Sequence, residues 1–270
     1  MRFIDTPIEH YDDIDVKRED LCLSTEKDEL AMPSLAKLRG AEVYLRKLKE
    51  NEVYHIGVFD TRVSKAGWGV AGLCKKIGLQ CHAYFPLLKG KQIAHQQVMA
   101  GAWKARLIAL KGGRTAILYR QAKKDLEKLS QSFMLPLGLV CKETVLEVAK
   151  ISAKLPKYGT IVVSTGTGTI AAGILAGLTK ENMPDKVIGI SCGMNLTKQR
   201  KRICDLLAEV GKGKNESILS LMMADRGYYE PDNINTPFPA HPYYDKKAWR
   251  WLLEHKKLLI KPVLFWNIGA

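Results

Sequence analysis

The chain has 270 residues, of which 46% are hydrophobic, so it can form one large domain or two modest ones, and a disordered chain is excluded. Lys and Arg number 42 against 28 Asp and Glu, which gives a formal net charge of +14. This balance favours a polyanionic partner, most simply nucleic acid, although a solvated lysine-rich surface would give the same total.

The cysteines and the apolar segments exclude further classes of protein. Six cysteines stand at positions 22, 74, 81, 141, 192 and 204 without CxxC spacing, so we expect reduced thiols and neither a zinc site nor a redox dithiol. The first residues contain no signal-peptide core. The uncharged span 158–179 is interrupted by Ser-Thr-Gly-Thr-Gly-Thr, which favours a strand, a turn and a buried helix over a membrane span. We therefore expect a cytoplasmic protein.

In chain order, β and α patterns alternate almost throughout. Helices are predicted from 33 or 34 to 48 and at 67–77, 121–130, 143–155, 198–210 and 245–255, with another after the turn at 165–169. Strands are predicted at 56–59, 80–85 (stopped by Pro86), 106–110, 160–164, 186–191 and 262–266, and a loop at 228–244. This alternation is typical of an α/β protein with a parallel sheet in a three-layer α/β/α arrangement. Residues 52–142 have a β/α set of their own, which predicts a small domain inserted between the halves, 1–51 and 143–270, of a larger one.

The glycine-rich turn at 165–169 predicts a phosphate site. A β-branched run precedes it and small residues follow it, so backbone N–H groups at a helix start and threonine hydroxyls can hold a phosphate without a lysine. Gly166-Thr-Gly168-Thr-Ile-Ala171 also fits the dinucleotide fingerprint. However, the next predicted strand leads into Ser191-Cys-Gly with no acidic residue for a ribose, and the motif lies past mid-chain. A different phosphate is therefore favoured.

Five segments in order resemble fold-type-II pyridoxal phosphate (PLP) enzymes of the tryptophan synthase beta-like superfamily. The resemblance is closest to the 1-aminocyclopropane-1-carboxylate deaminase and D-cysteine desulfhydrase branch. Its segments are the lysine segment at 32–42, a helix start and the next strand at 64–71 and 77–82, the phosphate loop at 165–169, a Pro-x-Tyr-Glu-x-Lys-like segment at 242–249, and a closing strand and glycine turn at 265–269.

The resemblance implies a role for each matching residue. Lys37 is the Schiff-base lysine, and the residues that bind the phosphate are Thr165, Gly166, Thr167, Gly168 and Thr169. Asp245 faces the pyridine nitrogen where the branch has Glu, and it keeps that nitrogen protonated. The alternatives are a surface lysine, a tight strand-to-helix turn and a helix cap, respectively.

Three more residues come from the same resemblance. Ser64 and Tyr244 match the active-site serine and tyrosine of the branch, with a helix cap and a loop anchor as the alternatives. Lys65 stands where the branch has an Asn that contacts the cofactor's hydroxyl. A lysine there could donate to that oxygen, bind an anionic group of the substrate, or point outward, so deaminase activity does not carry over directly.

The resulting hypothesis is a PLP-dependent lyase acting at the Cα of an amino-acid-like substrate. The positive charge favours the further hypothesis that the amino acid is carried on DNA. The enzyme would then decarboxylate an aminoacyl group attached to a base, as in bacteriophages that hypermodify thymine. Basic residues at 198–202 and at Lys246, Lys247, Arg250, Lys256 and Lys257 are candidate nucleic-acid contacts. The alternatives are a deaminase or desulfhydrase of a free small amino acid, and a non-catalytic nucleic-acid-binding descendant. The family implies a homodimer, located in the host cytoplasm if a phage encodes it.

Overall fold

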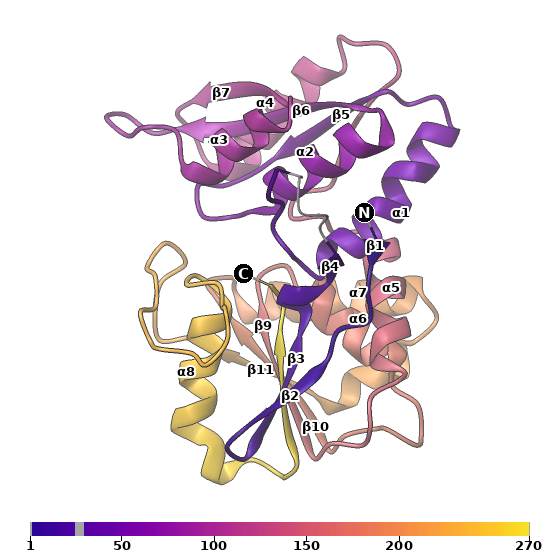
Figure 1. Ribbon diagram of the computed structural model, residues 1–270, viewed down its shortest axis with the longest axis vertical. Helices are drawn as coiled ribbons and strands as arrows, with labels where there is room; N and C mark the ends of the chain where they lie inside the picture. Colours follow the sequence, from indigo (N-terminus) through magenta and orange to yellow (C-terminus); the bar gives the residue numbers. More distant parts are fainter. Residues whose placement is uncertain (1, 25–29, 270) are drawn as a thin grey trace. The chain divides into compact units, whose positions relative to one another are not determined.

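The larger sheet of the molecule contains the strand that leads into the glycine-rich turn. The computed structural model describes residues 2–24 and 30–269 (Figure 1). Within these ranges, the strands of this sheet are β2 Ile8–Tyr11, β3 Ile14–Arg18, β9 Thr160–Thr165, β10 Lys186–Ser191, β11 Leu219–Met223 and β12 Val263–Asn267. Their order is β11-β10-β9-β12-β3-β2. β9 lies inside the sheet, between β10 and β12, so the loop after β9 begins at the carboxyl end of an interior strand, and α/β sheets bind ligands outside the carboxyl ends of their strands.

Helices cover both faces of this sheet. One face carries α5 Lys142–Ser152, α6 Thr169–Gly177 and α7 Leu196–Glu209, and the other carries α8 Asp245–His255 (Figure 1). Glycines let α6 approach α5 closely, because a Cβ at Gly177 would lie 2.2 Å from the carbonyl oxygen of Ala149. On the α8 face, Trp249 packs against Val162 and Phe265 in one buried cluster. Neighbouring residues of β9 therefore point toward different helices, which decides what each one contacts.

A second sheet lies within residues 41–140. Its strands are β5 His55–Phe59, β6 Gln80–Leu87, β7 Arg106–Lys111 and β8 Ser132–Met134, and all of these pair in parallel in the order β7-β6-β5-β8. The helices are α2 Ala66–Ile77, α3 His95–Ala102 and α4 Thr115–Leu126. A buried cluster joins Leu118, Ala122 and Leu126 of α4 to Phe59 and Tyr84 of the sheet.

The described residues form two compact units, 2–24 with 34–40 and 141–269, and 30–33 with 41–140. The division falls within α1, Lys37–Glu50, and not at residue 51 as the predicted boundary has it. Gly40 explains the position, because a Cβ there would lie 2.2 Å from the Cα of Thr144 in α5. Farther along the helix, Lys49 donates to the carbonyl of Ile77 in α2 at 2.6 Å.

Several predicted elements differ from the observed ones. α1 begins at Lys37 and not at Pro33 or Ser34, because residues before it pair with the end of the chain, as in the bridge between Leu35 and Gly269. β6 continues through Pro86 to Leu87. α4 starts at Thr115, six residues before the predicted start, because its buried stripe already begins at Leu118. The predicted bounds are confirmed for β10 and α8.

The sequence patterns did not reveal the N-terminal hairpin or several shorter elements. β2 and β3 form an antiparallel hairpin at the sheet edge, so the sheet is mixed and not purely parallel. β3 was missed because its alternation includes Lys17 and Arg18, which are buried and paired with acidic groups. The other elements without a sequence prediction are β1 Arg2–Phe3, β4 Leu23–Ser24, α3, β8, β11 and the short 3-10 helices Glu19–Leu21, Gly213–Ile218 and Lys256–Leu258.

Two exclusions drawn from the sequence can be compared with the described residues. None of their helices combines the length and the apolar content that a bilayer crossing requires. The six cysteines are free, and four of them are buried.

Candidate active site

Lys37 is the first residue of α1 and lies beside the glycine-rich loop. Its Nζ donates to the Thr167 hydroxyl at 3.5 Å, across 130 residues of sequence. The backbone before it is held by the end of the chain, because the Ala36 N–H donates to the Ile268 carbonyl at 3.0 Å. Gly269 is required in this contact, since its φ is +130° and a Cβ would lie 2.2 Å from the Ser34 carbonyl oxygen. The closing turn therefore positions the lysine.

The loop between β9 and α6 has the features of an anion site. Gly168 has a left-handed φ of +85°, and a Cβ there would lie 2.5 Å from Ile203. The hydroxyls of Thr167 and Thr169 lie 3.0 Å apart. The first turn of α6 is closed by the Ala172 N–H donating to the Gly168 carbonyl at 2.9 Å, so the N–H groups ahead of it have no intrahelical acceptor. Such N–H groups with hydroxyls beside them suit a phosphate.

Gln199 supports this loop and was not identified from the sequence. Its buried side chain donates to the carbonyls of Thr165 at 3.1 Å and Gly166 at 2.8 Å, and its Oε1 accepts from the Thr165 hydroxyl at 3.1 Å. From the sequence, the basic run at 198–202 is expected to contact nucleic acid. Gln199 is the one uncharged residue of this run, and the helical period places it on the side of the helix that faces β9. An uncharged polar residue at that position is the sequence signal that could have revealed its role. The Thr165 hydroxyl thus donates to Gln199, and this contact supports the loop from beneath.

Asp245 is fully buried at the start of α8. Its Oδ1 accepts from the Ser164 hydroxyl at 3.0 Å and from the Ile268 N–H at 3.1 Å. Burial raises the pKa of this carboxyl to about 7, although the hydrogen bonds to the carboxyl act to lower it. Its Oδ2 has no hydrogen-bond partner among the described residues. A buried carboxylate oxygen without a donor suits a ligand that carries a protonated ring nitrogen.

Tyr244 precedes Asp245, and its ring lies against the loop, 3.3 Å from where a Cβ of Gly166 would be. Its hydroxyl is 2.7 Å from the hydroxyl of Tyr228, a second residue that sequence analysis did not assign to the site. Tyr228 belongs to the segment predicted as a loop. This segment packs closely on Gly193, because a Cβ at Gly193 would lie 2.6 Å from the Cβ of Tyr228. A phenol pair of this kind can hold or pass a proton beside the loop.

Lys247 anchors the same segment, although sequence analysis assigned it to a nucleic-acid surface. The residue is 2% exposed, and its Nζ donates to the Gly227 carbonyl at 2.7 Å, next to Tyr228. Burial lowers the pKa of its ammonium group. The assignment of Lys247 to an exposed basic surface is therefore wrong, because its charged end faces the interior.

Ser64 and Lys65 lie in the second compact unit, at the start of α2. The Ser64 hydroxyl accepts from the Ala66 N–H at 3.2 Å, as a helix cap does. Lys65 is the N-cap residue, and its carbonyl accepts from the Gly69 N–H at 3.1 Å. The structure thus brings together Lys37, residues 165–169, Tyr244 and Asp245 within the first unit, and it gives Ser64 and Lys65 capping positions in the second.

These residues fit PLP in three respects: a lysine beside the loop, an anion-binding helix start, and a buried carboxyl oxygen that lacks a donor. Lys37 would hold the cofactor, the loop at 165–169 would bind its phosphate, and Asp245 would contact its ring nitrogen. No group of His, Cys, Asp and Glu among the described residues is arranged to hold a metal ion.

Comparisons with known proteins agree with this fit. Residues 5–228 match the family described as pyridoxal-phosphate dependent enzyme. A "Glycyl-dTMP PLP-dependent decarboxylase" of Pseudomonas phage M6 is 35% identical over 288 residues, covering 98% of each chain. The solved structure of an ACC deaminase homologue has a TM-score of 0.82 at 18% identity, over 98% of this chain and 89% of the other. Threonine deaminase isoform 2 from Solanum lycopersicum has a TM-score of 0.68 at 15% identity, over 100% and 80%. The chain therefore belongs to the pyridoxal-phosphate dependent enzyme family and has the fold-type-II architecture of its lyases.

Proposed function

We propose that this enzyme decarboxylates a glycyl group carried on a thymine nucleotide in DNA. The observation that supports this most is the 35% identity, along almost the whole of both chains, with the phage glycyl-dTMP decarboxylase. Structural neighbours such as the ACC deaminase homologue, threonine deaminase and diaminopropionate ammonia lyase are below 20% identical, so they support the fold and leave the substrate open.

The residues of the first unit suit this reaction. When bound, PLP supplies an electron sink for the bond that breaks at Cα. Lys37 is the proposed attachment site, and residues 165–169 would bind the phosphate. Asp245 has its pKa raised to about 7 by burial and keeps one oxygen without a donor, so it would stabilise a protonated ring nitrogen. Ser64 and Lys65 remain proposed contacts to the substrate and to the cofactor's hydroxyl.

Loss of CO₂ leaves an electron pair at Cα, and a proton must be delivered there to complete the reaction. Tyr244 is our proposed donor, because its hydroxyl is paired with that of Tyr228 at 2.7 Å and its ring lies against the loop. The pair can pass a proton between its two oxygens, so Tyr228 returns a proton to Tyr244 and is itself reprotonated by solvent, to which it is partly exposed.

The direct test gives the PLP-loaded protein a synthetic oligonucleotide that contains glycyl-modified thymine, and separately the modified mononucleotide. We expect release of CO₂ and a product that retains the amine. Lys37→Ala should abolish turnover, whereas Lys150→Ala, at an exposed surface position, should not. Release of ammonia from free D-cysteine or 1-aminocyclopropane-1-carboxylate, without CO₂ from either modified nucleotide, would support the deaminase alternative. A protein that binds no PLP would support the non-catalytic alternative. The homodimer stays a prediction.

A further inference from the structure

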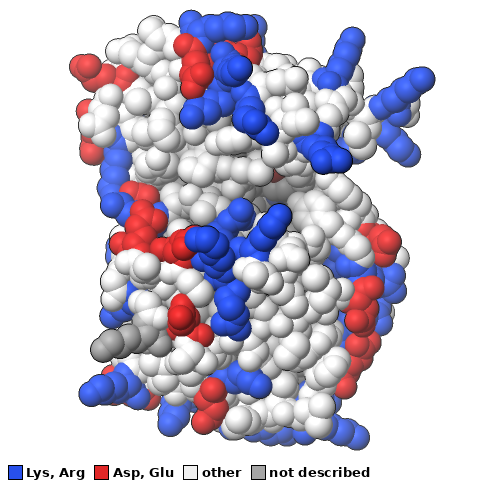
Figure 2. Space-filling view, turned by 180° about the vertical axis from the view of Figure 1, so that it is seen from behind, with Lys and Arg blue, Asp and Glu red and all other residues white. Residues whose placement is uncertain are grey.

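The positive charge of this chain is concentrated in one segment. Residues 41–140 carry 17 Lys and Arg against 6 Asp and Glu, so this segment has a formal balance of +11 out of the chain's +14. The segment makes up most of the second compact unit. On the face drawn in Figure 2, basic side chains form several groups with acidic and uncharged side chains between them, so the surface view alone does not single out one patch.

The basic runs singled out from the sequence are largely engaged within the protein. Lys247 is buried on a carbonyl, and Arg250 forms a two-point ion pair with Asp232 at 2.7 and 2.8 Å. In the run at 198–202, Arg200 donates to the Leu219 carbonyl at 2.8 Å and Lys201 pairs with Asp205 at 2.9 Å. Both runs therefore offer fewer cations to a partner than their sequences indicate.

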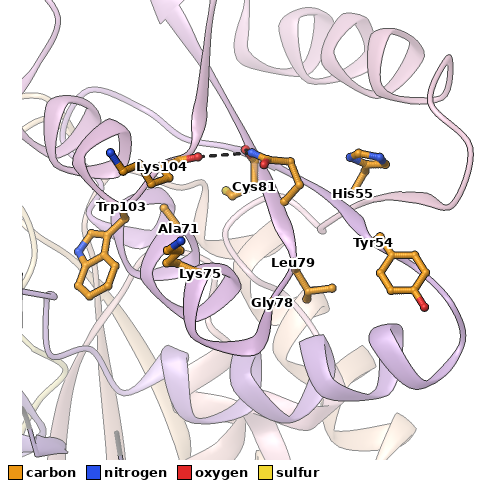
Figure 3. Close-up of a pocket in the computed structure, with 10 residues that line it drawn as sticks. Tyr54, His55, Ala71, Lys75, Gly78, Leu79, Cys81, Trp103 and Lys104 are labelled. Carbon is orange, nitrogen blue, oxygen red and sulfur yellow. Dashed lines mark hydrogen bonds between the residues drawn. The ribbon is translucent and has the colours of Figure 1, made fainter.

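A pocket of about 370 Å³ lies within the charged segment, where α2 ends, β6 begins and the turn after α3 passes (Figure 3). Its lining includes Lys75, Lys104, Gln80, His55 and Tyr54, and none of its ten lining residues is acidic. Figure 3 shows that Lys75 and Lys104 lie toward Trp103, while Tyr54 and His55 lie at the other end. A pocket of this size that combines two lysines with hydrogen-bonding side chains and contains no acidic residue suits an anion.

Lysines near a helix end often only neutralise the helix dipole, but other groups already do so here. Lys49 donates to the Ile77 carbonyl at the end of α2, and Lys76 lies over the Trp103 ring at 5.7 Å. Neither Lys75 nor Lys104 pairs with a carboxylate in the part of the chain that the structure describes. The Lys104 backbone is also fixed to the pocket, because its carbonyl accepts from Gln80 at 3.4 Å.

We infer that this pocket binds a backbone phosphate of duplex DNA, with Lys75 and Lys104 as the two cationic contacts. A phosphate contact carries no sequence information, so the pocket would hold the polymer irrespective of the bases around the modified thymine. The inference rests on the proposed function in one respect, namely that the nucleotide substrate is part of DNA.

The test measures binding of a labelled, unmodified duplex to the full-length protein between 50 and 200 mM salt. The variant carries Lys75→Gln with Lys104→Asn, the latter because Asn tolerates the left-handed φ of +66° at that position. Losing the contact with this one phosphate should reduce the slope of log affinity against log salt by about 0.9. The wild type should then lose roughly 3.5-fold more affinity than the variant over this range.

The control variant, Lys123→Gln with Lys128→Gln, removes the same charge from the exposed surface of α4 and its C-terminal end. It should keep the wild-type slope within about half a unit. Bound duplex should also protect Lys75 and Lys104 from acetylation more than Lys123 and Lys128, as read by mass spectrometry. Equal slopes for the two double variants, equal acetylation at the four lysines, or no duplex binding by the wild type would overturn the inference.

Turnover of the modified mononucleotide separates this inference from the proposed function. The Lys75 and Lys104 variant should decarboxylate the mononucleotide at the wild-type rate, because a mononucleotide has no flanking phosphates to be held. Failure of the wild type to release CO₂, together with a reduced salt slope in the variant, would refute the proposed reaction and leave the DNA site standing.

Discussion

Replacing Asp245 by Asn should remove a large pH dependence from the stability of the cofactor-free protein. Burial raises the pKa of this carboxyl from 3.8 to about 7. Between these two values the folded state keeps a proton that the unfolded state has lost, so stability is full below about pH 4 and falls as the pH rises to about 7. The loss is about 1.4 kcal/mol for each pH unit, so above about pH 7 the ionised Asp245 lowers the free energy of unfolding by about 4 kcal/mol.

The Asn side chain resembles the protonated carboxyl and cannot ionise. Its oxygen can still accept from Ser164 and Ile268, as Oδ1 of Asp245 does. The variant should therefore match the wild type near pH 4 and exceed its free energy of unfolding by up to about 4 kcal/mol at pH 8. Urea unfolding at both pH values, followed by the fluorescence of buried Trp249 and Trp266, measures this difference.

Asp232→Asn is the matched control because Asp232 is also buried, at 1% exposure, and its pKa moves the other way. Burial alone would raise the pKa of Asp232, but the hydrogen bonds from Arg250 and the Ile234 N–H hold it below its usual value. Its ionised form stabilises the fold above the unfolded pKa, so this variant should be less stable than the wild type at pH 8. A gain for Asp245→Asn that is equal at pH 4 and pH 8 would refute the reasoning.

Three further predictions concern the loop and its neighbours. Lys37→Ala should fold normally but yield no PLP adduct after borohydride reduction, whereas the wild type should carry the adduct on the peptide that contains Lys37. Gly168→Ala should cost about 2 kcal/mol more stability in thermal unfolding than Gly211→Ala, because both positions have a positive φ but only a Cβ at 168 would overlap a neighbour. Tyr228→Phe should lower kcat roughly tenfold and shift its pH profile with little change in KM, because the Tyr244 hydroxyl loses its partner; an unchanged profile would argue against the phenol pair.

The predictable part of the fold is the part with strong local signals. The run Lys186–Ser191 and the helix Asp245–His255 match their predicted bounds, because a β-branched run and an acidic helix start are local features. The edge hairpin was not predicted, since Lys17 and Arg18 in β3 lie in the interior only because acidic residues from other segments pair with them. A local pattern reports hydrophobicity and contains no information on such partners.

At Pro86 a local signal predicts the end of a strand too early. Proline cannot donate a ladder hydrogen bond, so it predicts the end of a strand. In the structure β6 runs two residues further, and Pro86 stands opposite Leu110 of β7 near the end of both strands. One missing N–H near a strand end interrupts little of the ladder, so the neighbouring strand decides where β6 stops.

The chemical state of the site depends on contacts that no local pattern contains. The residue types of the lysine, the glycine-rich loop and the acid could be assigned by resemblance. The raised pKa of Asp245, however, results from burial beside Ser164 and Ile268, which are 81 and 23 residues away in sequence. A carboxyl that titrates near neutrality can accept a ring proton or give it up within the ordinary pH range, whereas an exposed Asp would remain ionised. The activity of Asp245→Glu tests how closely this position is fitted: the longer acid should keep the contact with the ring nitrogen only if the closing turn at Ile268 can move to admit it.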